Sequence, residues 1–336
     1  MTAATIKDVA REAKVSVASV SRALNGGAGV TAATRERIHA AAKRLHYIPH
    51  AAARMLITRR THTIGALLPD LHGEFFSELI RGIDLAARAR GLHLLVSSSH
   101  DGVEEVAAAL RAMQGRVDGL LLMSPHADAD FLRKNLPAEL PTVLMNTRLA
   151  GTDYCALSVD NEGGARLIVE HLLSRNRRRI AFIRGPAGNR DAAERERGYR
   201  QALADSATGS EAMTLAGDFS EESGYRAGQQ LLAMPHRPDA VFAANDMMAI
   251  GFLSALREAG VDVPGEIAVA GFDEVPMARY VTPALTTIQV HIADLGRQAM
   301  EMLGEQIDNP GSITPGTRRH VGAELVARAS SAAPGT

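Results

Sequence analysis

The sequence predicts a small all-α helix-turn-helix headpiece with a hinge helix, followed by a larger α/β domain of two lobes. Residues 5–45 show only helical periodicity, whereas from Thr63 onward short apolar runs alternate with amphipathic segments of 10–17 residues. The charge divides at the same place: residues 1–60 hold 11 Lys and Arg against 3 Asp and Glu, and the remainder holds 26 against 35. A chain of 336 residues also exceeds one ordinary core, so separate domains are expected.

A basic head on an acidic body suggests that only the head meets a polyanion such as nucleic acid; a solvated basic surface is the alternative. No apolar run approaches the ~18 residues of a membrane span. The start, MTAATIKDVAREA, lacks the pattern of a secretory signal, so we expect a cytoplasmic chain with no membrane partner. The single cysteine, Cys155, excludes an internal disulfide framework. The 12 histidines are scattered and no phosphate-loop, GxSxG or HExxH motif occurs, so we expect no enzyme, metal or cofactor.

Residues 5–24, TIKDVAREAKVSVASVSRAL, predict two helices joined by a short turn. Thr5 and Asp8 have the spacing of a capping box, and Ser16 is placed to cap the second helix. We expect Lys14 at the turn position that needs a positive φ, at a cost of roughly 1 kcal/mol. A third helix is expected in TRERIHAAAKRLHY. Apolar residues at i, i+3, i+4 and i+7 give the first helix its buried face: Ile6, Val9, Ala10 and Ala13.

The second helix is predicted to enter the major groove of DNA, where the outward residues near its start reach base edges. Arg22 can fork onto a guanine, whereas Val17 and Ala18 can make only apolar contacts, for example to thymine methyl groups. Short polar side chains suit phosphates, although each serine could equally be a cap or a solvated hydroxyl. These polar candidates are Ser16, Ser19, Ser21 and Asn25.

TIKDVAREAKVSVASVSRALNG and VTAATRERIHAAAKRLHYIPHAAARML resemble the headpiece and hinge of the lactose-repressor/galactose-repressor (LacI/GalR) family, and the similarity extends to about residue 327. The resemblance implies a homodimer on a palindromic operator, with paired hinges and Leu56 wedged into the minor groove. AAARML is only about two turns long and should be marginal as an isolated helix. An ordinary linker with Leu56 in a local contact is the alternative. We add Thr5 and Ala53 to the predicted DNA contacts.

Two sets of strands alternating with helices predict two α/β lobes, with a ligand between them at the carboxyl ends of the strands. Asp160 and Asp246 fit helix caps better than ligand contacts, and Phe76 fits the core. A structural ion pair is the alternative role for Arg195 and Asp273. Polar or aromatic residues at strand ends and in the first turns after them are the candidates for effector contact: Asp70, Phe75, Arg195, Phe219, Asn245 and Asp273.

For this domain, the resemblance implies the fold of type I periplasmic sugar-binding proteins. It also implies crossovers between the lobes near Asp160, near residues 288–292 and near residues 318–323. HGEFF replaces the frequent NPFF, which leaves the roles of His72 and Glu74 open. The resemblance implies effector contacts for Arg195, Asn245 in the AND motif, Asp273 in the G-aromatic-D motif, Phe219 and Phe75.

The sequence therefore predicts a transcriptional repressor whose operator affinity is controlled by a small molecule, most simply a sugar or sugar derivative acting as inducer. A purine-type corepressor is the main alternative. A sugar-binding transport protein would need a signal sequence and no basic head. The expected boundaries are residues 1–49 for the headpiece, 50–61 for the hinge and linker, 62–327 for effector binding and dimerisation, and 328–336 for a tail.

Overall fold

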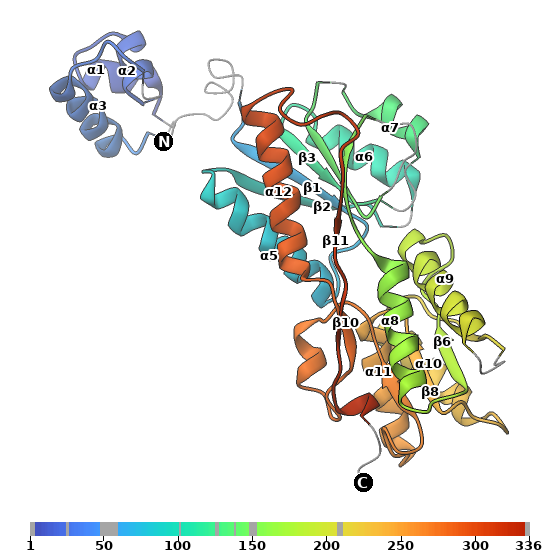
Figure 1. Cartoon of the computed structure of the whole chain (residues 1–336). Coiled ribbons are helices and arrows are strands. Elements are labelled where there is room, and N and C mark those ends of the chain that lie inside the picture. Colours follow the sequence, from blue (N-terminus) through green and yellow to red (C-terminus); the bar gives the residue numbers. More distant parts are fainter. Residues whose placement is uncertain are drawn as a thin grey trace. The chain divides into compact units, whose positions relative to one another are not determined.

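The structure, a computed structural model, describes residues 4–24, 27–47, 60–100, 102–124, 128–137, 139–147, 153–206 and 211–332. The chain divides into two units, Met1–Thr61 and His62–Thr336 (Figure 1). The division falls where the sequence changes from helical periodicity with positive charge to alternating strands and helices.

The first unit contains helices α1 (Ile6–Glu12), α2 (Val17–Leu24) and α3 (Ala32–Arg44). The turn between α1 and α2 has the predicted form, since Lys14 has a φ of +51° and Ser16 Oγ accepts a hydrogen bond from the Ser19 backbone N–H at 3.1 Å. The Asp8 carboxylate accepts from the backbone N–H and the hydroxyl of Thr5, at 2.9 and 2.6 Å. Small residues let the three helices approach closely over a core of Val9, Ala10, Ala13, Val20, Ala23, Ile38, Ala41 and Ala42.

The first lobe of the second unit is a parallel sheet with the strand order β11-β5-β4-β3-β1-β2. Helices α5 (Glu74–Ala89) and α12 (Ile292–Asp308) pack side by side on one face (Figure 1), and α6 (Val103–Met113) and α7 (Ala129–Asn135) cover the other. Because both faces are covered, the central strands β1, β3, β4 and β5 are buried and mostly apolar, whereas the edge strands β2 and β11 are partly exposed and carry polar residues. The strands are β1 (Thr63–Leu68), β2 (His93–Ser98), β3 (Gly119–Leu122), β4 (Thr142–Met145), β5 (Cys155–Val159) and β11 (Arg318–Val321).

The second lobe is a parallel sheet with the order β7-β6-β8-β9. Its helices pack in pairs, α8 (Asn161–Ser174) on α9 (Arg190–Asp205) and α10 (Glu221–Leu232) on α11 (Asp246–Glu258). Glycine is required where α10 meets α11, since a Cβ on Gly251 would lie 1.8 Å from the carbonyl oxygen of Glu221. The strands are β6 (Ile180–Ile183), β7 (Met213–Leu215), β8 (Ala240–Ala243) and β9 (Ala268–Ala270).

The chain passes between the lobes three times. β5 leads into α8 at Asp160, β10 (Thr287–Gln289) leads into α12, and β11 continues into β12 (Glu324–Val326), which pairs antiparallel with β10. These are the crossovers expected near Asp160, 288–292 and 318–323. Each lobe is therefore discontinuous in sequence, and any relative movement of the lobes must bend three segments of chain.

Residues 328–332, which the sequence led us to assign to a tail, are folded onto the second lobe around the short 3-10 helix η2 (Ala329–Ser331). Ser330 and Ser331 are fully buried. The Ser330 hydroxyl donates to the carbonyl oxygen of Val269 at 2.6 Å, and the Ser331 hydroxyl lies 2.7 Å from Nε2 of His171. Buried hydroxyls keep this position because their hydrogen bonds replace those to water.

Over the described residues, no helix is long and apolar enough to cross a membrane, and no cluster of three or more His, Cys, Asp or Glu could bind a metal ion. Cys155 is buried in β5, as its apolar surroundings in the sequence predict. Burial raises the pKa of its thiol, which favours the unreactive protonated form.

Candidate functional site

One side of α2 presents the predicted DNA-contacting residues to solvent. Val17, Ala18 and Arg22 are exposed, and Ser19 and Ser21 are half-buried. The Arg22 Nε donates to the carbonyl oxygen of Ala18 at 3.3 Å, which lays the guanidinium along the helix. A fork-shaped cation beside small apolar side chains can contact base edges in a major groove. Three further predicted contacts lie outside the described residues: Asn25, Ala53 and Leu56.

A cavity of about 560 Å³ lies between the two lobes, at the carboxyl ends of their strands. Its size suits a small organic ligand. Residues from the first lobe and from the second lobe line it together. The six residues predicted from the sequence for effector contact all face this one space: Asp70, Phe75, Arg195, Phe219, Asn245 and Asp273.

Arg195, on α9, is the most constrained side chain of the cavity. Its guanidinium forms an ion pair with Asp273 at 3.0 Å, and both side chains are buried. It also donates to the Asn161 side-chain oxygen at 2.9 Å and to the Ala244 carbonyl oxygen at 2.5 Å, and it stacks 3.8 Å from the centre of the Phe272 ring. Burial raises the pKa of Asp273 to about 6, and the Arg195 charge opposes that rise. Arg195 and Asp273 thus form a structural ion pair and also line the cavity.

Asn245 holds the aromatic wall of the cavity. It is the N-cap of α11, accepting from the Met248 backbone N–H at 3.0 Å, and its amide donates to the carbonyl oxygen of Phe219 at 3.0 Å. Phe219 has a φ of +74°, a backbone conformation that is costly for a phenylalanine. The bond from Asn245 therefore helps fix both the strained backbone and the ring that lines the cavity.

The prediction that Asp246 caps a helix is wrong, because its neighbour Asn245 takes that position. Asp246 is fully buried and accepts from the Thr287 hydroxyl at 2.6 Å and from the Val275 backbone N–H at 2.9 Å. Burial, and then the negative charge of Asp273, raise its pKa well above the ordinary value. Asp246 therefore ties α11 to the crossover strand β10. By contrast, Asp160 caps α8 as predicted.

Sequence reasoning missed several residues that line the cavity, among them the polar residues Asn146 and Asp191. Asn146 follows β4 with a φ of +48°, and Asp191 lies in the first turn of α9. The Asn161 amide donates to Asp191 at 3.0 Å, and the nearby side chain of Asn146 also lowers the pKa of Asp191. Burial raises the pKa of Asp191 to about 6. A polar residue ending the apolar run LPTVLMN was a usable signal for Asn146, but nothing in RDAAERERGYR distinguishes Asp191 from its charged neighbours.

In the loop after β1 and the first turn of α5, Phe76 differs from expectation, and the structure describes His72 and Glu74, whose roles were left open. Phe76, expected in the core, also lines the cavity, with its ring edge-on to Phe75 at 5.4 Å between centroids. Glu74 accepts a hydrogen bond from the Met277 backbone N–H of the second lobe at 2.8 Å, so it bridges the lobes. His72 is exposed, and its backbone N–H donates to Asp70 at 3.1 Å.

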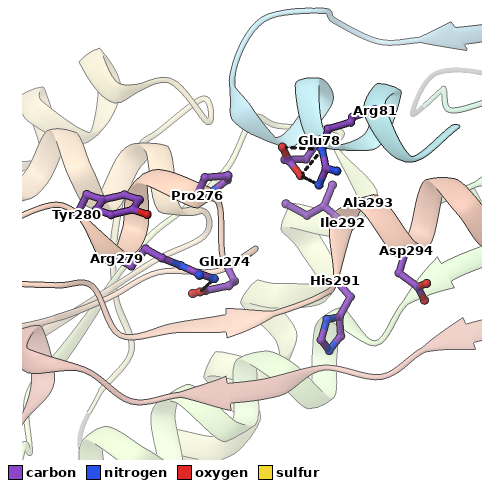
Figure 2. A pocket seen from close by; sticks show the side chains of 10 residues that line it. All are labelled: Glu78, Arg81, Glu274, Pro276, Arg279, Tyr280, His291, Ile292, Ala293 and Asp294. Carbon is purple, nitrogen blue, oxygen red and sulfur yellow. Dashed lines mark hydrogen bonds and ion pairs between the residues drawn. The ribbon is translucent and has the colours of Figure 1, made fainter. Parts of the chain in front are cut away.

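A second cavity, of about 460 Å³, lies where α5, the 3-10 helix η1 (Pro276–Arg279) and the start of α12 meet (Figure 2). Its charged side chains neutralise one another within the protein. Arg81 pairs with Glu78 at 2.5 Å, and Arg279 pairs with Glu274 at 2.9 Å. None of the residues predicted for effector contact lines it. The cavity between the strand ends is therefore the better candidate for the effector.

Known proteins match both units. The model for bacterial regulatory proteins of the lacI family matches residues 5–50, and the model for the periplasmic binding protein-like domain matches residues 169–331. The HTH-type transcriptional repressor PurR of Escherichia coli is 39% identical over 311 residues, which cover 91% of each chain. The lac repressor dimer bound to operator and the anti-inducer ONPF has a TM-score of 0.88 at 28% identity, covering 98% of this chain and 99% of that chain. A complex of the transcriptional regulator CelR with cellobiose has a TM-score of 0.71 at 32% identity, covering 97% and 99%.

Proposed function

Because the chain belongs to the lacI family of bacterial regulatory proteins, we propose that it acts as a homodimer on a palindromic operator and is released by a sugar or sugar derivative. Family membership makes it a DNA-binding transcriptional repressor under effector control, and not an enzyme. In this proposal residues 1–49 bind DNA, residues 50–61 form the hinge, and residues 62–327 bind the effector and dimerise.

The sugar proposal is supported chiefly by the composition of the cavity between the lobes. Arg195 and Asp273 offer directional, charge-assisted hydrogen bonds, which suit vicinal hydroxyl groups. The rings of Phe75 and Phe219 line the same space and can pack on the apolar face of a pyranose. The CelR relative binds cellobiose in a fold of the same kind.

The DNA proposal rests on the exposed side of α2 and on the basic charge of residues 1–60. Arg22, Val17 and Ala18 would contact base edges, while Thr5 and the short polar residues of α2 would contact phosphates. In the hinge, Ala53 and Leu56 would contact the minor groove at the operator centre. The lac repressor relative is a dimer bound to operator, which is the arrangement proposed here.

Control would work by linkage between the two sites. A ligand in the cavity contacts both lobes, so it favours one arrangement of the lobes over another. The three crossover segments would carry this change in lobe arrangement from the second lobe to the first lobe, which the hinge precedes in the sequence. A coupling of about 1–3 kcal/mol, a factor of about 5–150 in operator affinity, is the usual scale.

A purine corepressor is the second candidate, favoured by the 39% identity to PurR over most of the chain. A planar base could stack between the cavity phenylalanines. The two candidates predict opposite signs, because an inducer releases the operator whereas a corepressor tightens binding.

The test is a fluorescence anisotropy titration with DNA from upstream of the protein's own gene. Full-length protein is bound to this DNA, and sugars and purine bases are added separately. Release by a sugar supports the proposal, and tightening by a purine replaces it with the corepressor alternative. Binding should also weaken steeply as salt rises, because phosphate contacts release counterions. Binding no better than to an unrelated duplex at low salt would contradict sequence-specific recognition at that site.

A further inference from the structure

One corner of the cavity between the lobes offers hydrogen-bond acceptors that the protein leaves partly unused. We call it the acceptor corner; it consists of Asn146, which follows β4 in the first lobe, and Asp191, in the first turn of α9 in the second lobe. The two residues are close enough for the side chain of Asn146 to lower the pKa of Asp191. The acceptor corner thus brings acceptors from both lobes together at the site where the effector is proposed to bind.

The side-chain oxygen of Asn146 is buried and has no hydrogen-bond partner among the described residues, although the residue is only 8% exposed. A buried acceptor without a donor is costly, so a missing donor from a ligand is the simplest explanation. Because an amide oxygen can only accept, this atom calls for a hydrogen-bond donor.

The hydrogen bond to Asp191 comes from a neutral amide, that of Asn161, at 3.0 Å, while the charge of Arg195 lowers the pKa of Asp191 from nearby. The neighbouring guanidinium groups have other close partners: Arg195 pairs with Asp273 at 3.0 Å, and Arg190 pairs with Glu194 at 3.0 Å. A carboxylate that accepts from one amide still has lone pairs for further donors.

The charges that line the cavity also favour a ligand that carries no negative charge. Arg190 and Arg195 face it, and both are engaged as described above. The carboxylates outnumber them, although two of the four, Asp70 and Asp218, are exposed; an added anion would be repelled most strongly beside the desolvated carboxyl groups of Asp191 and Asp273. These carboxylates are Asp70, Asp191, Asp218 and Asp273.

We propose that the effector places a pair of hydrogen-bond donors, hydroxyl or amino groups, on the acceptor corner, and that the cavity therefore takes uncharged or amine-bearing sugars and rejects sugar phosphates and sugar acids. The inference rests on the proposed function and deepens it by setting the charge of the ligand. A donor pair that bridges Asn146 and Asp191 also contacts both lobes at once, which is the differential contact that linkage to the operator requires. Rejection follows where the phosphate or carboxylate group faces the acceptor corner, because that group supplies no donor there and adds a negative charge beside Asp191.

The test compares matched ligands on full-length protein by thermal shift and then by calorimetry. The probes are glucose, galactose, ribose and cellobiose, their amino derivatives where these exist, and the corresponding phosphates and uronic acids. We expect at least one neutral or amino sugar to raise Tm, and its phosphate or acid counterpart to have no effect. A phosphate or an acid that binds as tightly as its neutral parent overturns the inference.

The decisive variant is Asp191→Asn, which keeps the size of the side chain and removes its charge. We expect affinity for the neutral or amino probe to fall about ten- to a hundredfold, while discrimination against the acid counterpart narrows. Asp205→Asn is the matched control, since Asp205 ends the same helix and pairs on the surface with Arg166 at 2.9 Å. An unchanged affinity in Asp191→Asn refutes the inference.

A second variant covers the case in which Asp191→Asn fails to fold. Asn146→Gly removes the acceptor and accepts the positive φ of that position. It should weaken binding of the same probe about as much as Asp191→Asn does. If no neutral or amino sugar shifts Tm, the inference is wrong, whereas specific operator binding by the same preparation would leave the repressor function standing. If only a purine binds, the sugar proposal fails as well.

Discussion

The headpiece and the cavity assemble their functional residues in different ways. In the headpiece, Val17, Ala18 and Arg22 come from one helix, whose start is fixed by the local hydrogen bond to Ser16. In the cavity, Arg195 is held by bonds to three other segments of the chain, including Asp273. A mutation in the headpiece should therefore change DNA recognition without changing the stability of the fold. In the cavity the same bonds stabilise the lobe and shape the ligand site, so one mutation should change both.

The largest effect is expected for Arg195→Ala. Removing the guanidinium leaves Asp273 buried without its cation, and breaking a buried pair in this way costs about 3–5 kcal/mol. We expect the unfolding transition of the effector domain to move to much lower denaturant concentration, with loss of ligand binding. Arg197→Ala is the control on the same helix, because its pair with Glu162 at 3.4 Å is exposed and should be worth less than about 1 kcal/mol. Equal stability of the two variants would contradict the structural role assigned to Arg195.

The next effect tests the other half of the comparison. Arg22→Ala should cost about 1–3 kcal/mol of operator affinity, concentrated at one base pair, because one bidentate contact is lost. The thermal stability should stay unchanged, since Arg22 is exposed. A binding assay on operators that vary at single positions measures this, with Arg44→Ala as control, because Arg44 pairs with Glu12 away from α2. An identical sequence preference in wild type and Arg22→Ala would show that the guanidinium reads no base.

The same difference explains what the sequence could predict. Periodicity and capping gave the headpiece helices, including the unusual turn at Lys14, because these depend on neighbours in the chain. The expected strand ends, and the first turns after them, predicted the six effector contacts, all of which line the cavity. Asp191 was missed because its importance comes from Asn146 in the other lobe, and no local pattern records that approach. Asp246 was misassigned because two adjacent residues could both cap α11, and burial against β10 decides between them.

A pH titration tests the cavity half of this comparison through its buried carboxyl groups. Burial raises the pKa of Asp191 and of Asp273 to about 6, against an ordinary value of 3.8. Between these values the folded state holds protons that the unfolded chain releases, so the stability of the effector domain falls as the pH rises through this window. We expect each of the two groups to contribute a loss on the order of 3 kcal/mol across this window, measured by urea titrations at successive pH values. Asp191→Asn should reduce the dependence to the part that comes from Asp273, and a slope identical to that of wild type would contradict the assignment to Asp191.

The smallest effect concerns one backbone feature that both regions share, a positive φ at a residue other than glycine. Lys14→Gly relieves strain of about 1–2 kcal/mol in the α1–α2 turn but increases the freedom of the unfolded chain, so a net gain of about 0.5 kcal/mol is expected. Amides of α1 and α2 should then exchange about twofold more slowly in hydrogen exchange on the full-length protein. Phe219→Gly relieves the same kind of strain but removes a ring that lines the cavity, so ligand affinity should fall. If both glycine variants stabilise the protein without functional loss, the ring of Phe219 has no part in binding and the contrast between the two regions fails.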